Sequence, residues 1–221
     1  GILSLLLPRK VIGLRVLLAA LGPILALALF GLSMHQSHGF AGWAHTQWMP
    51  AFKINLTLNA DALGMFFAFL VSAIGLLIVL YARAYFGPDK DSLYRFYPSL
   101  LLFMTAMLGV ALADNFMLLL FWEMTSISSF LLIGWERDDA KAVKLAMQAF
   151  ITTALGGLAM MGGLILMGVH TGAWTFSELY ALKEAGTLPM GATLTWAFVL
   201  TFVGAAAKSA QWPLHFWLPG A

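Results

Sequence analysis

Residues 115–135 read NFMLLLFWEMTSISSFLLIGW. A spanning helix needs about 20 mostly apolar residues, and this run meets that length with a single acid, Glu123, near its middle. A charge at mid-bilayer costs on the order of 3 kcal/mol, so such a group is protonated or paired and faces the interior of a helix bundle. Ser126, three residues on, lies on the same face and could hydrogen-bond it. We interpret Glu123 as functional; the alternative is a neutral acid that holds helices together.

The composition of the whole chain indicates a membrane protein. Of its 221 residues, 61% are hydrophobic and 10% are charged, against roughly 25% charged residues in soluble domains. There are no cysteines, which excludes disulfides, thiolate metal sites and iron–sulfur clusters built from this chain. The net charge of +2 is too small to suggest nucleic acid. We therefore expect an all-α polytopic bundle of membrane helices, without a metal site or a cofactor.

Six segments have the length and the low charge of a spanning helix. They lie at 16–34, 62–82, 96–113, 116–135, 145–169 and 193–218. The apolar leader Gly1–Pro8 is too short to span and is interpreted as the end of a truncated helix. Residues 1–221 are thus expected to form a single membrane domain, the N-terminal fragment of a longer chain.

The lysines and arginines predict the orientation of these segments. Nine of them fall in the connections on one side, and two, Lys53 and Lys183, fall on the other. Cytoplasmic loops carry the excess of basic residues, so the side with nine is predicted to be cytoplasmic.

The outer loop at 35–61 is expected to carry a little structure of its own. Its end, at 52–59, alternates apolar and polar residues, which predicts a short strand and the possibility of a hairpin. Asp61 and Asp114 each precede a predicted helix, and an acid there caps free N–H groups. We expect both to be helix caps.

Lys208 lies about fifteen residues into the last segment, also at mid-depth. A buried lysine is a proton site whose affinity for the proton depends on whether an acid stays close. Glu123 is its natural partner. The alternative is a static ion pair, which stability alone explains poorly, because burying a pair is often no gain.

The helix that carries Lys208 is predicted to be broken. Pro213 has no N–H to donate, and broken helices at membrane depth often mark ion sites in transporters. Gln211 and His215 follow Lys208 by three and seven residues and would share its face on an unbroken helix. Histidine can relay protons near neutral pH, although a lone one is more often an interfacial residue.

A polar stripe opens the fifth segment, where Lys141, Lys144, Gln148 and Thr152 are spaced by three, four and four residues. It runs inward from the predicted cytoplasmic end. One interpretation is the lining of a water-filled half-channel. The other is that the two lysines are interfacial anchors.

These motifs resemble a known family. The stretches at 61–86, 100–115, 121–135 (FWEMTSISSFLLIGW), 154–163 and 207–219 (AKSAQWPLHFWLP) are similar to the A subunit of Mrp-type cation/proton antiporters, and more broadly to the antiporter-like subunits of respiratory complex I. Ala207 departs from the threonine that the family usually has before its lysine.

The resemblance implies that Glu123 and Lys208 are the acid and the lysine through which this family moves protons, with His215, Gln211 and Lys144 as candidate relays. It implies a multi-pass protein of the bacterial inner membrane that works with the other subunits of an Mrp complex. Protons and a monovalent cation such as sodium would be its substrates. It implies a secondary transporter subunit, not an enzyme.

Two alternatives remain open from the sequence. The first is a proton-pumping subunit of a complex I-like or hydrogenase-linked assembly, which would be a translocase and would copurify with redox subunits. The second is a non-transporting scaffold, in which a size-matched apolar pair at Glu123 and Lys208 would preserve all activity.

Overall fold

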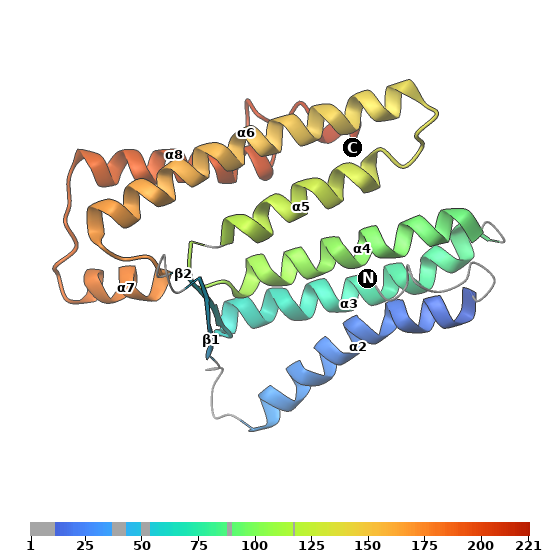
Figure 1. The fold of residues 1–221 in the computed structure, drawn as a ribbon, viewed down its shortest axis with the longest axis horizontal. Coiled ribbons are helices and arrows are strands. Elements are labelled where there is room, and N and C mark those ends of the chain that lie inside the picture. Colours follow the sequence, from blue (N-terminus) through green and yellow to red (C-terminus); the bar gives the residue numbers. More distant parts are fainter. Residues whose placement is uncertain (1–11, 37–42, 50–53, 88–89, 117) are drawn as a thin grey trace. The chain divides into compact units, whose positions relative to one another are not determined.

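The computed structural model describes residues 12–36, 43–49, 54–87, 90–116 and 118–221. Within these ranges the chain forms helices and one two-stranded sheet (Figure 1). It divides into two units, which we describe one at a time. The leader and Lys53 lie outside the described residues.

The first unit consists of three packed helices: α2 (Ile12–Gln36), α3 (Ala62–Tyr85) and α4 (Lys90–Leu112). Helices are therefore confirmed at the first three predicted segments, and α4 begins six residues earlier than expected. The prediction for Asp61 is also confirmed. Its side chain accepts a hydrogen bond from the N–H of Gly64 at 2.7 Å and so caps α3.

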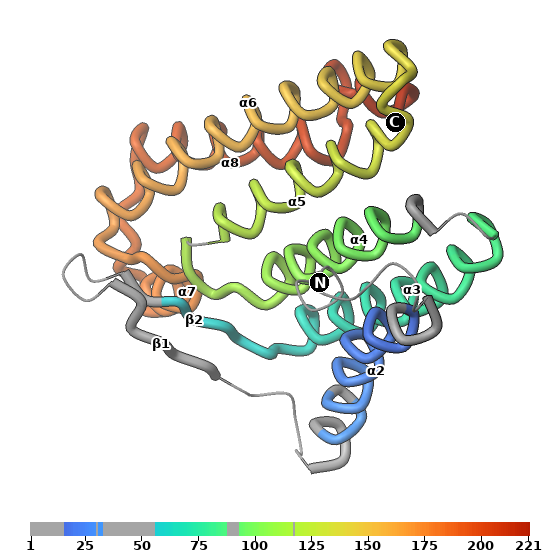
Figure 2. The backbone as a smooth tube through the Cα atoms, turned by 45° about the vertical axis from the view of Figure 1, so that its right-hand side comes forward, coloured from blue at the N-terminus to red at the C-terminus, as the bar shows by residue number. Residues whose placement is uncertain are grey.

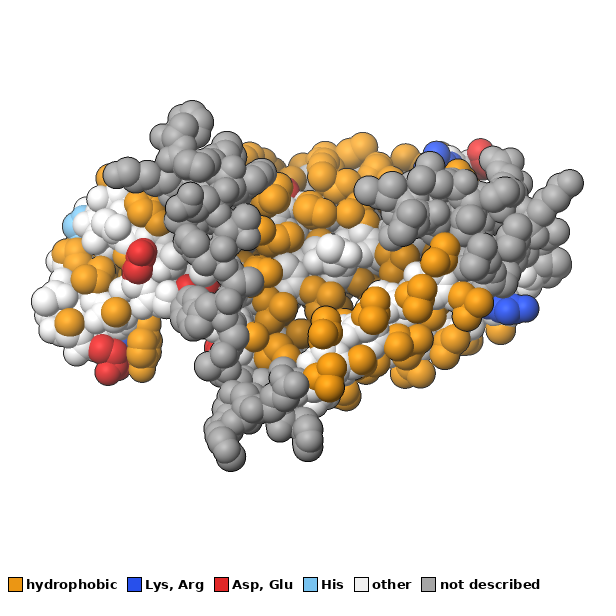
Figure 3. All heavy atoms as spheres, turned by 60° about the horizontal axis from the view of Figure 1, so that its bottom comes forward, with side chains coloured by type: hydrophobic (Ala, Val, Ile, Leu, Met, Phe, Trp, Pro, Cys, Tyr) orange, Lys and Arg blue, Asp and Glu red, His pale blue; other side chains and the backbone are white. Residues whose placement is uncertain are grey.

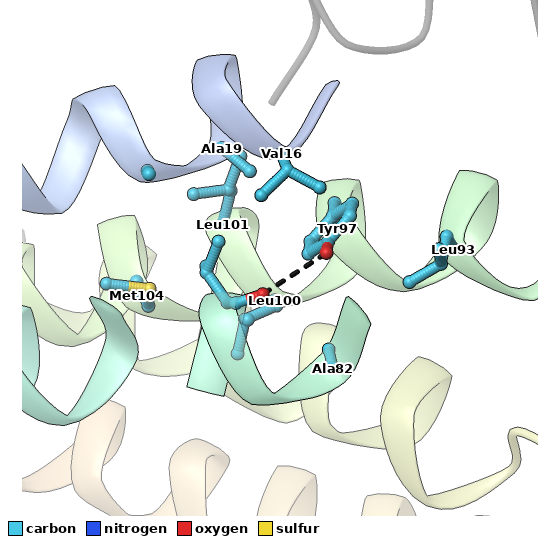
Figure 4. Close-up of a cluster of buried hydrophobic side chains, with 10 residues drawn as sticks. Val16, Ala19, Ala82, Leu93, Tyr97, Leu100, Leu101 and Met104 are labelled. Atoms are coloured by element: carbon cyan, nitrogen blue, oxygen red, sulfur yellow. Dashed lines mark hydrogen bonds between the residues drawn. The ribbon is translucent and has the colours of Figure 1, made fainter. Parts of the chain in front are cut away.

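The core of this unit is apolar and closely packed, and Figure 4 shows most of its side chains. The one phenol in it, that of Tyr97, is 1% exposed. A buried hydroxyl needs a partner, and Tyr97 donates to the carbonyl oxygen of Val79 at 3.1 Å, which links α4 to α3. Gly75 on α3 leaves the space that the side chain of Met104 fills.

The second unit begins with a hairpin of β1 (Trp43–Met49) and β2 (Ile54–Asn59), which confirms the predicted strand. Its helices are α5 (Leu118–Ile133), α6 (Ala140–Thr171), α7 (Phe176–Glu184), α8 (Ala192–Lys208) and the short 3₁₀ helix η2 (Leu218–Gly220). Figure 2 shows α6 and α8 side by side along most of their length.

Glycines allow α6 and α8 to pack closely. A Cβ atom on Gly163 of α6 would lie 2.6 Å from the carbonyl oxygen of Ala197 on α8. A Cβ on Gly204 of α8 would lie 2.6 Å from the carbonyl oxygen of Gly156 on α6. Small residues at such crossings are typical of membrane helices, because backbones can then approach each other.

The short helix α7 was not predicted, and it changes the role of Asp114. The Asp114 carboxylate accepts from the N–H of Ser177 at 3.1 Å and from its hydroxyl at 2.5 Å, in the first turn of α7. Asp114 therefore binds the first turn of α7, and its capping of the helix that follows it in sequence stays a prediction, because Met117 lies outside the described residues. Its backbone N–H donates to Thr57 at 2.9 Å, so the turn at 113–116 is held between β2 and α7.

Three helical stretches among the described residues are long and apolar enough to cross a membrane: Ala62–Tyr85, Leu93–Leu112 and Ala140–Thr171. Three of the predicted spans correspond to shorter apolar stretches, at Val16–Leu29, Leu118–Ile133 and Ala192–Lys208. Figure 3 shows that hydrophobic side chains cover much of the described surface on this face and that few charged ones are visible there. This surface suits contact with lipid or with other membrane proteins.

Candidate functional site

Glu123 lies in the second turn of α5, about 7.5 Å along the axis from the start of the helix at Leu118. The part of α5 that follows is polar on its inward side, where Thr125 and Ser126 are each 1% exposed. Hydroxyls can be buried there because they bond to their own helix: Thr125 donates to the carbonyl of Trp122 at 2.6 Å. The helix therefore presents an acid and hydroxyls to the interior of its unit.

The carboxylate of Glu123 fills a gap on α6. A Cβ atom at Gly157 would overlap its oxygen Oε1, so the missing side chain of this glycine makes room for the acid. Oε1 is buried and has no hydrogen-bond partner among the residues that the structure describes. An unpartnered buried oxygen is costly for a charged carboxylate, so Glu123 is a group whose environment is not permanently satisfied.

Lys208 is the last residue of α8, and its ammonium is held by α5. Nζ donates to the hydroxyl oxygen of Ser126 at 2.9 Å and lies 5.8 Å from the centre of the Trp122 ring. The hydroxyl of Ser126 is 3.5 Å from the carbonyl of Trp122, to which it donates in turn. The expected bond between Ser126 and Glu123 is therefore replaced by one between Ser126 and Lys208.

Glu123 and Lys208 thus come to one place in the second unit, from helices 85 positions apart in sequence. They make no direct ion pair; the ammonium is bonded to Ser126, which stands three residues from the acid on α5. Opposite charges this close still attract through a poorly polarisable interior. The arrangement can hold a proton on the lysine and can change its affinity for that proton by moving the acid.

The break after Lys208 comes earlier than the proline predicts. The N–H of Gln211 donates to the carbonyl of Ala206 at 2.9 Å, and the N–H of Ala210 to Ala207 at 3.4 Å. This is the Schellman pattern, with Ala210 at the left-handed position (φ 51°) that glycine usually occupies. The expected helix across 193–218 is therefore wrong beyond residue 208.

A tryptophan completes the end of α8. The indole N–H of Trp217 donates to the carbonyl of Ala207 at 3.0 Å, so the helix end is satisfied by the protein itself. Gln211 and His215 lie beyond the break with exposed side chains and do not share a helical face with Lys208. The structure does not bring these two candidate relays to the lysine.

A small cavity adjoins Lys208. Its volume is about 30 Å³, which exceeds the roughly 10–15 Å³ that a site needs to hold a water molecule. Its polar lining consists of Lys208 with the hydroxyls of Ser126, Ser129 and Thr153, and its apolar lining includes Trp217. A site of this size with several polar partners suits one water molecule beside the ammonium.

Lys144 lies in a different place, an open groove of about 880 Å³ on the first half of α6. Gln148 and Thr152, the next members of the predicted polar stripe, line the same groove. Three members of the predicted stripe, Lys144, Gln148 and Thr152, thus share one face of α6, whereas Lys141 is not part of the groove lining. Phe216, from the segment after the break in α8, lies on the opposite wall.

Sequence reasoning missed several residues of the site. Gly157 was not predicted as a site residue, because nothing in its sequence context points to a carboxylate. Trp122 and Trp217 were two aromatic residues among many in an apolar chain. Ser129 does carry a signal, because with Ser126 it places hydroxyls three residues apart behind an intramembrane acid.

Two protein-family models match this chain. One, described as the NADH:quinone oxidoreductase/Mrp antiporter transmembrane family, matches residues 112–221. The other, described as the N-terminus of chain 5 of NADH-ubiquinone oxidoreductase (complex I), matches residues 46–97. Glu123 and Lys208 both fall in the first match.

Curated relatives match most of this chain. An antiporter subunit of Staphylococcus haemolyticus is 40% identical over 206 residues, 92% of this chain and 26% of the relative. Na(+)/H(+) antiporter subunit A1 of Staphylococcus aureus is 44% identical over 175 residues, 79% of this chain and 22% of the relative. The chain thus spans about a quarter of the length of the curated relatives it matches.

Solved structures agree with the sequence matches. A chain of the Mrp complex from Dietzia sp. DQ12-45-1b has a TM-score of 0.77 at 31% identity, covering 99% of this chain and 24% of that one. A chain of respiratory complex I from Thermus thermophilus has a TM-score of 0.79 at 24% identity, covering 100% and 44%; it shows the shared fold. The chain therefore belongs to the family of antiporter subunits that includes the A subunits of Mrp-type antiporters and the related membrane subunits of complex I.

Proposed function

We propose that this chain is the proton-conducting half-module of a subunit in a multisubunit Na⁺/H⁺ antiporter of the Mrp type. The observation that carries the proposal is the buried cluster in which the ammonium of Lys208 bonds to Ser126 beside the Glu123 carboxylate. Ionisable groups inside a membrane protein are expensive and are functional by default. The 40–44% identity to antiporter subunits supports the same conclusion.

In the proposed mechanism Lys208 carries the proton. When the Glu123 carboxylate is close, it stabilises the ammonium, and the proton stays on Nζ. When the carboxylate moves away, the ammonium gives its proton to a neighbouring acceptor and becomes a neutral amine. A water molecule in the cavity beside Ser129 and Thr153 is suited to accept it, since hydroxyls and water exchange protons readily.

Lys144, Gln211 and His215 are the proposed relays. The groove that Lys144 lines with Gln148 and Thr152 gives this lysine polar neighbours along α6. Gln211 and His215 have exposed side chains, accessible to water or to a further part of the protein. A proton that leaves Lys208 could reach either of them only through water, because α8 ends at the lysine.

Residues 1–221 are proposed to form one membrane domain, because the two family models match residues of both units. Other subunits of the complex, and a cation such as sodium, complete the activity. The relatives that support these partners are about four times as long as this chain. The route of the cation is therefore not assigned to these residues.

A redox-driven proton pump is the second candidate, because the family match at 46–97 is to a complex I subunit. Its mechanism would use the same lysine and acid and would make the chain part of a translocase. Copurification of iron–sulfur or quinone-reactive subunits with the intact complex would favour it. Their absence, together with sodium-driven proton flux in closed vesicles, would favour the antiporter.

The direct test uses the whole complex, with this chain in its full-length protein, in sealed membrane vesicles. Lys208→Ala should abolish cation-driven proton flux, and Glu123→Ala should lower it about tenfold, because it removes a charge that tunes the lysine. Both variants must be present at the parental level. Flux that survives both substitutions would refute the mechanism, and full activity of a Glu123→Met/Lys208→Met pair would favour a structural scaffold.

A further inference from the structure

The Glu123 carboxylate and the Lys208 ammonium lie at separate positions in the site. A different uncharged residue accommodates each of them. Glu123 lies where a side chain on Gly157 of α6 would be. Lys208 is bonded to Ser126 of α5. Neither Gly157 nor Ser126 carries a charge, so neither could itself form an ion pair with Glu123 or Lys208.

The place of Glu123 depends on space alone. Gly157 is buried in α6, and a Cβ atom there would overlap Oε1 of the acid and lie 3.0 Å from its carboxyl carbon. No turn or positive φ requires glycine at this position, which is in the interior of a regular helix. A glycine in a helix interior is less favourable than alanine, and the room it leaves for the carboxylate is what offsets that cost.

The place of Lys208 depends on one hydrogen bond. Ser126 is 1% exposed, and its oxygen accepts from Nζ while its own proton points to the backbone carbonyl of Trp122. The Trp122 ring lies within the reach of a cation–π contact with the same ammonium. Glu123 is the acid whose charge acts on Lys208, and the described lining of the adjoining cavity contains no other titratable side chain.

We propose that Gly157 and Ser126 are positioning residues that keep the acid and the lysine of this site apart. Gly157 gives the carboxylate a resting place on α6, and Ser126 holds the ammonium on α5. The state seen here is then the disengaged one of two states, and a direct pair of Glu123 and Lys208 is the other. This inference rests on the proposed proton-transfer function. It identifies the residues that set the equilibrium between the separated and the paired state of Glu123 and Lys208.

Ser126 is tested by the pH profile of proton flux in vesicles that contain the intact complex. Ser126→Ala removes the acceptor of a charge-assisted bond and should shift the pH of half-maximal flux by about one unit. Ser126→Cys keeps the shape of the side chain with a slightly larger, weaker acceptor, so it should shift the profile in the same direction if the alanine variant fails to assemble. Ser128→Ala is the matched control, because Ser128 is equally buried on α5 and bonds only to backbone carbonyls.

Gly157 is tested by a compensating pair. Gly157→Ala should displace the carboxylate and shift the profile, whereas Gly162→Ala on the same helix should not, because its Cβ would meet nothing closer than 4.0 Å. Glu123→Asp shortens the acid by one methylene and retracts it from α6. In that background, adding Gly157→Ala should cause no further shift.

The outcomes separate this inference from the function on which it rests. Full flux in Lys208→Ala would refute the proposed function itself. Loss of flux in Lys208→Ala, with unshifted profiles in Ser126→Ala, Ser126→Cys and Gly157→Ala, would leave the function standing and overturn the positioning roles. Equal shifts from Gly157→Ala with glutamate and with aspartate at 123 would also overturn the role of Gly157.

Discussion

The two units of this chain bury different kinds of side chain. In α2, α3 and α4 the buried core is apolar, and its phenol, Tyr97, is bonded to a backbone carbonyl. In the described part of that unit the unpartnered buried side-chain atom is a neutral hydroxyl, on Ser72. In the second unit the buried polar atoms include an acid oxygen of Glu123, and Lys208 reaches into the same cluster.

This difference indicates which unit is suited to the proposed proton transfer. A satisfied apolar core gives a unit one stable arrangement, whereas charged groups with incomplete partners can take more than one. The first unit is therefore suited to packing, and the second to changes of protonation. Substitutions in the first unit should alter stability alone, while those around Glu123 and Lys208 should alter flux.

The largest effect on stability is expected at the contact of α6 with α8. In Gly163→Leu the new side chain would meet the backbone of Ala197 and Thr201, which cannot move aside easily. We expect a loss of about 3 kcal/mol or more, seen as a failure of the purified complex to assemble. Gly162→Leu, one residue away, should assemble normally; equal failure of both would contradict the packing described here.

A cavity in the first unit should lower stability nearly as much as Gly163→Leu, but it should leave proton flux unchanged. Leu93 is 1% exposed, and Leu93→Ala leaves a void that costs about 2 kcal/mol. The complex should melt at a lower temperature, while flux per intact complex stays at the parental value. A changed pH profile in this variant would break the division of roles between the two units.

Removing the buried phenol bond of the first unit should have a smaller effect. Tyr97→Phe deletes the bond to Val79 and leaves that carbonyl with its helical partner, at a cost of about 1 kcal/mol. Thermal melting of the purified complex measures it. A melting temperature equal to that of the parent would show that the bond contributes nothing.

The smallest effect is expected at the end of α8, and it is stabilising. Ala210 adopts a left-handed conformation, which costs an L-residue about 1 kcal/mol or more and costs glycine nothing. Ala210→Gly should raise stability by about 0.5 kcal/mol after the extra entropy of glycine in the unfolded chain is counted. A lower melting temperature would contradict the strain inferred at this position.

Glu123 and Lys208 could be found from the sequence because an ionisable residue in an apolar run is visible without any structure. The predicted helices could be found because long apolar runs are visible in the sequence in the same way. The end of α8 could not be placed, because it is set by the conformation of Ala210 and by a bond from Trp217, ten residues away. Pro213 predicted that the helix carrying Lys208 is broken, but not the residue at which it ends.

Other features were missed because their signals are short. Helix α7 has nine residues, far fewer than a span, although Thr175 and Glu178 form a capping box that is readable in the sequence. Asp114 was predicted to cap the helix nearest in sequence, and its carboxylate also binds the first turn of α7, which begins 62 positions later. Only the fold brings those two segments together.

The most direct test of the account is a double-mutant cycle on proton flux in vesicles that hold the intact complex. If the acid acts only by tuning the lysine, the losses from Glu123→Gln and from Lys208→Arg, which keeps the charge and is used where it leaves a measurable flux, should not add: the double variant should be no worse than Lys208→Arg alone. The pH profile of Glu123→Gln should also differ from that of the parent. Losses that multiply independently, with an unchanged profile in Glu123→Gln, would mean that the two charges do not work on one proton.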